Sequence, residues 1–219
     1  MHTRSNFDSN LKELKEILLD MAQKAEAAVK EAMLALVNQD LEKARQVVEG
    51  DNVIDQMDHD INDKALILIA KEAPVATDLR KIIVAIKIST EVERIGDQAV
   101  NIAKSTLHIG TEKQFKEIID IPKMLDLSLE MLTDALTAFY SEDVVLAKKC
   151  AEKDDKVDEM YGKLIQELMG YIPENPNATN QLTQLAYVCR YVERIADQTT
   201  NIAENVIFLV TGKRYDLNA

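Results

Sequence analysis

The sequence is poor in the residues that interrupt long helices. Its 219 residues include only six Gly and four Pro, no Trp, and 5% aromatic residues in total. Few Gly and Pro mean few tight turns, which argues against a sheet built from many short strands. Because 47% of the residues are hydrophobic, the chain has enough apolar side chains for a core. The composition therefore favours long, packed helices.

Cysteine is too scarce to build a disulfide framework. Cys150 and Cys189 show no metal-ligand spacing and both lie in helical apolar patterns, so they are expected to be core thiols of a cytosolic protein. Residues 1–10 contain no apolar run of the kind found in a signal peptide. No stretch approaches the ~20 apolar residues that span a bilayer. We therefore expect a cytoplasmic protein that meets the membrane only through partners.

Positive charge is also scarce. The chain has 26 Lys and Arg against 38 Asp and Glu, a net charge of −12. A nucleic-acid-binding protein needs a basic surface that displaces counterions, so that class is excluded. Direct adhesion to an anionic membrane is disfavoured for the same reason. A cationic partner or bound metal ions are favoured instead.

Six helices are predicted from apolar residues that recur every three or four positions. They cover about residues 7–37, 41–72, 77–109, 124–140, 143–170 and 180–210, with breaks at Asn38–Asp40, Pro74, Gly110, Ser141–Asp143, Pro173–Pro176 and Gly212. The third helix matches the sixth position for position, and the second matches the fifth in the same way. An internal duplication explains this match. It predicts an all-α fold of two tandem antiparallel three-helix bundles, residues 1–112 and 113–219.

Each repeat carries the same acidic motif on its last helix. The motif is Glu93, Asp97 and Asn101 in the first repeat and Glu193, Asp197 and Asn201 in the second. Residues four apart stack on one side of a helix, and this column lies roughly opposite the apolar stripe. Like charges at this spacing repel by roughly 0.2–0.5 kcal/mol on an isolated helix. We therefore expect a cation at the column.

A second pair of acids is predicted at the same height on the preceding helix. Asp55 and Glu93 are equally distant from Pro74 in the sequence, one before it and one after it. The same is true of Asp51 and Asp97. In the second repeat, Asp158 with Glu193 and Asp154 with Asp197 are symmetric about Asn175–Pro176. Equal residue counts on antiparallel helices mean equal heights, so each bundle should gather four carboxylates.

Oxygen-only clusters of this kind suit hard metal ions. Mg, Mn or Ca, or carboxylate-bridged iron, are expected rather than zinc, which prefers nitrogen and sulfur. His59, one turn beyond Asp55, is a candidate ligand of the first site, but Gly162 takes its place in the second repeat. A metal-free alternative is that Arg94 and Arg194 neutralise the acids as ion pairs.

Several motifs together resemble the PhoU family of phosphate-signalling proteins. They are Glu93-Arg94-Ile95-Gly96-Asp97 and Glu193-Arg194-Ile195-Ala196-Asp197, each followed by Asn-Ile-Ala, together with Ala73–Arg80 at the first hairpin turn and Phe7–Leu14 near the start. The resemblance covers nearly the whole chain. It implies a cytoplasmic homodimer that binds metal through the four acidic pairs Asp51/Asp55, Glu93/Asp97, Asp154/Asp158 and Glu193/Asp197. It also implies partners, namely the phosphate ABC transporter and a sensor histidine kinase.

The resemblance implies a negative regulator of the phosphate regulon, an adaptor rather than an enzyme. Where many family members have His after the motif's Asp, this chain has Gln98 and Gln198, so no nitrogen ligand is carried over. No nucleophile–base pair, phosphate-binding loop or basic anion pocket is evident. Phosphate binding by protein groups is therefore not expected, although a bound metal could supply an anion site. The alternative function is a carboxylate-bridged metal enzyme or a metal store, although neither repeat has the Glu-x-x-His motif of di-iron bundles.

Overall fold

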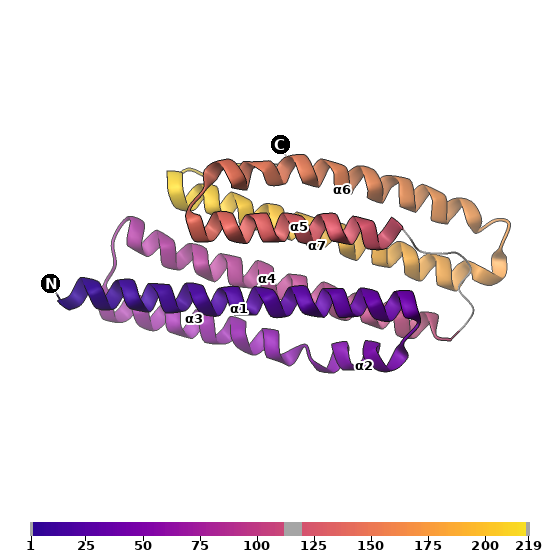
Figure 1. The fold of residues 1–219 in the computed structure, drawn as a ribbon, viewed down its shortest axis with the longest axis horizontal. Helices are drawn as coiled ribbons and strands as arrows, with labels where there is room; N and C mark the ends of the chain where they lie inside the picture. The colour runs from indigo at the N-terminus through magenta and orange to yellow at the C-terminus, as the bar shows by residue number, and fades with distance from the viewer. Residues whose placement is uncertain (1, 112–119, 218–219) are drawn as a thin grey trace.

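The computed structural model describes residues 2–111 and 120–217, whose regular structure is entirely helical, without strands. The helices are α1 His2–Asn38, α2 Leu41–Glu49, α3 Asn52–Glu72, α4 Thr77–Ile109, α5 Asp120–Ser141, α6 Val144–Tyr171 and α7 Thr179–Thr211, with a 3₁₀ turn, η1 Pro176–Ala178, before α7. Helices α1 to α4 form one bundle and α5 to α7 the other, side by side (Figure 1). The predicted all-α duplication is confirmed. The expected boundary between residues 112 and 113 lies outside the described residues.

The starts of the equivalent helices α2 and α6 use the same cap. Asp40 accepts a hydrogen bond from the Lys43 backbone N–H at 3.0 Å. Asp143, its counterpart in the second repeat, accepts from the Val145 and Leu146 N–H groups at 2.8 and 3.0 Å. These bonds satisfy donors that lack a partner inside the helix. The duplication is therefore visible in local structure as well as in the apolar pattern.

The second helix of the first repeat is interrupted, whereas a single helix from residue 41 to Pro74 was expected. Helix α2 ends at Glu49 and α3 begins at Asn52, so Gly50 and Asp51 lie at the break. Glycine is about 1 kcal/mol less favourable than alanine inside a helix. Lys153 stands at the position equivalent to Gly50 in the second repeat. Its Nζ forms ion pairs with Glu130 of α5 at 2.6 Å and with Asp134 at 2.7 Å. Helix α6 continues through this position without a break.

The two bundles meet where α4 packs on α7. The two helices are antiparallel (Figure 1), and their end contacts are reciprocal. Arg80 donates to the Leu209 carbonyl at 3.2 Å. Asn180, the counterpart of Arg80 in the second repeat, donates to the His108 carbonyl at 3.3 Å. The contact therefore resembles the two-fold interface of a homodimer, formed here within one chain.

Apolar side chains of every helix form one continuous core. The fully buried side chains of this core include Leu18, Met21, Ile61, Ile88, Met124, Phe139 and Ile195. Close to the acidic motif, Ile54 packs directly on Gly96, where an added Cβ would lie 3.0 Å from its Cδ1. This close approach brings the start of α3 against the middle of α4. Among the described residues, none of the helices combines the length and apolarity that crossing a bilayer requires.

Replacing Ile88 by Ala should destabilise the protein through a cavity at the core of α4. Ile88 is fully buried, and such truncations cost about 2–5 kcal/mol of unfolding free energy. The matched control is Ile83→Ala on the same helix, where the side chain is 37% exposed and a loss below about 1 kcal/mol is expected. Urea unfolding followed by circular dichroism measures both. Equal losses in the two variants would contradict this placement of the core.

Candidate functional site

The first acidic cluster forms where the α2–α3 break meets the middle of α4. It contains Asp51, Asp55, Glu93 and Asp97, as the count from Pro74 predicted. Burial raises the pKa values of Asp51, Glu93 and Asp97, and each is raised further by neighbouring acids, Asp55 in every case. Asp97 also acts on Asp51 and Glu93. The four carboxylates are therefore near enough for their charges to act on one another.

A fifth acid, Asp58, belongs to this cluster and was missed from the sequence. Its charge raises the pKa of Glu93, and its Oδ1 accepts a hydrogen bond from the Ser89 hydroxyl of α4 at 2.6 Å. Asp58 and Ser89 are almost equally distant from Pro74 in the sequence, so the same count would have found the pair. His59 is exposed, and its role as a ligand stays a prediction.

The second cluster joins Asp158 of α6 to Glu193 and Asp197 of α7. Burial raises the pKa of Glu193 to about 7, and the charges of Asp197 and Asp158 contribute. The pKa of Asp197 is also raised, mainly by burial. Glu193 is only 8% exposed, although its column was expected to face away from the core. The neighbours that act on Glu193 all belong to its own bundle: Asp158 of α6, and Arg190 and Asp197 of α7.

Asp154 lies deeper than the other predicted ligands. It is 4% exposed, and its charge raises the pKa of the Cys150 thiol, which burial above all lifts to about 11. Burial likewise lifts the pKa of Cys189 to about 12. Both thiols are therefore protonated at neutral pH, in line with their predicted place in the core. Neither is a reactive nucleophile.

The basic residues near the acids differ from those expected. Arg94 pairs with Glu91 at 3.1 Å, and its charge only weakly offsets Glu93. Lys104 and then Arg194 partly offset the rise in the pKa of Asp97. Arg190 and then Arg194 do the same for Asp197. The direct ion pair is made by Arg190, which contacts Glu193. Comparing the two repeats could not reveal Arg190, because the equivalent residue in the first repeat is Thr90.

The carboxylates of each cluster are neighbours rather than a converged set of ligands. Among the described residues, no three His, Cys, Asp or Glu side chains converge closely enough to hold a metal ion. The donors are all oxygens, which fits hard cations. Gln98 and Gln198 are buried, and the Gln98 amide donates to the Arg94 carbonyl at 3.0 Å.

Glu193→Gln should stabilise the chelator-treated protein at pH 8. Because the folded pKa of about 7 exceeds the ordinary Glu value near 4.3, the folded state binds more protons between these values. Stability therefore falls as pH rises through this window. The variant should gain about 1–3 kcal/mol at pH 8 and almost nothing at pH 4. The free energy of unfolding, measured for both proteins across this pH range, tests the prediction. Glu152→Gln, at an exposed position, is the control. A pH-independent difference would contradict the burial of the charge.

Comparison with known proteins shows similarity over both bundles. A family model for the PhoU domain matches twice, over residues 18–106 and 121–206. The phosphate-specific transport system accessory protein PhoU homolog of Clostridium acetobutylicum is 40% identical over 217 residues, 99% of each chain. The crystal structure of PhoU from Pseudomonas aeruginosa is 34% identical with a TM-score of 0.89, over 94% of this chain and 100% of that one.

The phosphate transport system regulatory protein PhoU from Streptococcus pneumoniae is similar to this chain to the same degree. Its crystal structure is 32% identical with a TM-score of 0.89, over 96% of this chain and 99% of that one. The two matches to the family model fall one on each bundle, and the fold is shared along nearly the whole length. The resemblance seen in the sequence is therefore confirmed, and the chain belongs to the PhoU family.

Proposed function

We propose that this chain is an accessory protein of a phosphate-specific transport system. In that role it restrains phosphate uptake and holds the phosphate-starvation response off when phosphate is plentiful. The observation that supports this most directly is the 40% identity, over 99% of both chains, to a relative named for that system. The proposed partners are the ATPase of the phosphate ABC transporter and a sensor histidine kinase. The proposed location is the cytoplasm, and the proposed state a homodimer.

Docking to other proteins suits the surface of the first bundle. Large apolar side chains are exposed on α3, at the turn that follows it and on α4: Leu66 60%, Ile67 51%, Val75 75%, Leu79 36% and Ile83 37%. Exposed apolar side chains that adjoin one another mark protein interaction surfaces. They support a regulator that acts through contacts rather than through chemistry of its own.

We further propose that both acidic clusters bind a hard divalent cation or iron. The first would use Asp51, Asp55, Glu93 and Asp97, and the second Asp154, Asp158, Glu193 and Asp197. The raised pKa values support this, because burial and, after it, the charges of neighbouring acids disfavour the ionised carboxylates, and a bound cation would favour them. Such an ion would draw the carboxylates together and stiffen the contact between adjacent helices.

The two clusters should differ in affinity. Among the described residues, no acid of the first cluster is in direct ion-pair contact with a basic side chain, and Lys104 acts on Asp51 and Asp97 only through its charge. In the second cluster Arg190 already contacts Glu193, and a metal would have to compete with it. The first cluster is therefore the proposed tighter site.

Titration with Mn²⁺, read by calorimetry and by the loss of the free-ion spin-resonance signal, should give two unequal sites. Combining Asp55→Asn, Glu93→Gln and Asp97→Asn should remove the tighter one. Arg190→Met should strengthen the weaker one roughly three- to tenfold, since it removes a competing cation. Arg45→Met, an exposed residue of α2 that pairs with Glu42, is the control. Equal affinities, or no response to Arg190→Met, would contradict the proposed order.

The regulatory role is tested in a strain that lacks its PhoU-family gene and carries a phosphate-starvation reporter. The unchanged chain should silence the reporter in phosphate-rich medium. A variant with Glu93→Gln, Asp97→Asn, Glu193→Gln and Asp197→Asn should silence it less, if the cations support the docking-competent form. Failure of the unchanged chain to silence the reporter would contradict the proposal. Robust metal-dependent oxidation or hydrolysis by the purified protein would favour the enzyme alternative instead.

A further inference from the structure

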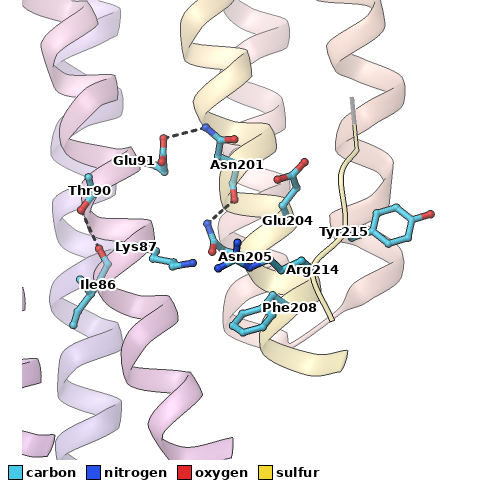
Figure 2. A pocket seen from close by; sticks show the side chains of 10 residues that line it. All are labelled: Ile86, Lys87, Thr90, Glu91, Asn201, Glu204, Asn205, Phe208, Arg214 and Tyr215. Atoms are coloured by element: carbon cyan, nitrogen blue, oxygen red, sulfur yellow. Dashed lines mark hydrogen bonds between the residues drawn. The ribbon is translucent and has the colours of Figure 1, made fainter. Parts of the chain in front are cut away.

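A pocket of about 410 Å³ lies between α4 and α7, and none of the eight predicted metal ligands lines it. The residues after α7 fold back beside it and complete its wall (Figure 2). Leu217 anchors this C-terminal segment by donating its backbone N–H to Glu204 at 2.8 Å. Lys148 of α6 lies 5.0 Å from the centre of the Tyr215 ring. The pocket is thus built from both repeats and the chain's last described residues.

The acids that line the pocket already have partners. Glu91 pairs with Arg94 at 3.1 Å and accepts from the Asn201 amide at 3.3 Å. Glu204 accepts the Leu217 N–H described above. Figure 2 shows the bond between Asn201 and Glu91 at the upper rim. Their negative charge is therefore partly compensated by the protein itself.

The cations that line the pocket are in the opposite situation. Lys87 and Arg214 both point into the space between the helices (Figure 2). Within the described part of the chain neither forms an ion pair with a carboxylate, although acids outnumber bases by 12. Lys87 lies 5.7 Å from the centre of the Phe208 ring, and Arg80 lies at the same distance from that ring. Among the described residues, positive charge therefore gathers around Phe208 without a direct ion pair.

We propose that this pocket binds a small phosphate-bearing anion, held by Lys87 and Arg214. The planar Arg fork matches two oxygens of a phosphoryl group, and the Lys ammonium adds a point charge. The volume lies within the usual range for small-molecule pockets, roughly 300–1,000 Å³. It accommodates inorganic phosphate with water or a small phosphorylated metabolite. Phe208 offers an apolar floor for the organic part of the latter.

The proposed anion would link α4 of the first repeat to the C-terminal segment of the second. Its binding would hold that segment against α7 and strengthen the contact between the bundles. This inference stands on the pocket's own residues. It holds whether or not the acidic clusters bind metal, and whether or not the chain regulates transport.

Calorimetry and thermal shift of the chelator-treated full chain test the proposal at constant ionic strength. Inorganic phosphate and glycerol 3-phosphate are the probes, and malonate is the carboxylate comparison. Lys87→Met and Arg214→Met should each weaken binding of the better phosphate probe at least tenfold. Lys213→Met, which neutralises the neighbouring exposed cation, should leave it within about twofold. Whichever probe binds better identifies free phosphate or a phosphorylated metabolite as the source.

Three results would overturn the proposal. One is that neither phosphate probe binds at millimolar concentration or that malonate binds better. Another is that the Lys87 and Arg214 variants bind as the unchanged chain does while keeping its circular dichroism spectrum. The third is that phosphate binds only after Mn²⁺ is added and not to the Glu93→Gln, Asp97→Asn variant. That result would place the anion on a metal cluster.

Discussion

The antiparallel contact between α4 and α7 is the constraint on which the rest of the structure depends. Each of these helices carries its repeat's acidic motif and also packs in its own bundle's core. Their contact joins the two bundles along the helices that carry the acidic motifs. It also creates the pocket that neither repeat could form alone. Site geometry in this chain is therefore a property of the pair of repeats.

Most of the fold could be predicted because it follows from local rules. Apolar periodicity gives the helices, and Asp40, Asp143 and Gly212 mark their ends. The break at Gly50 was not predicted. One glycine costs about 1 kcal/mol in a helix, which packing often offsets. In the second repeat Lys153 stands at this position and ties its helix to α5 through two ion pairs, whereas Gly50 has no side chain to do so.

The candidate site was predictable only where it depends on height along a helix. Counting from the proline turns placed Asp55 level with Glu93, and the pKa shifts agree. Counting carries no information about which neighbour turns towards an acid, so the Arg190–Glu193 contact was missed. It also cannot reveal the pocket, because Lys87 and Arg214 belong to different repeats and meet only across the interface between the bundles.

The reciprocal contact between α4 and α7 has an evolutionary consequence. In a homodimer of single repeats, every substitution at the interface appears twice, so both sides must tolerate it. Joining the copies in one chain removes that restriction. Lys87 faces the pocket on one side, while its counterpart is Tyr187, and Thr90 corresponds to Arg190. A tandem chain can thus keep a symmetric scaffold while its two sides specialise for different ligands.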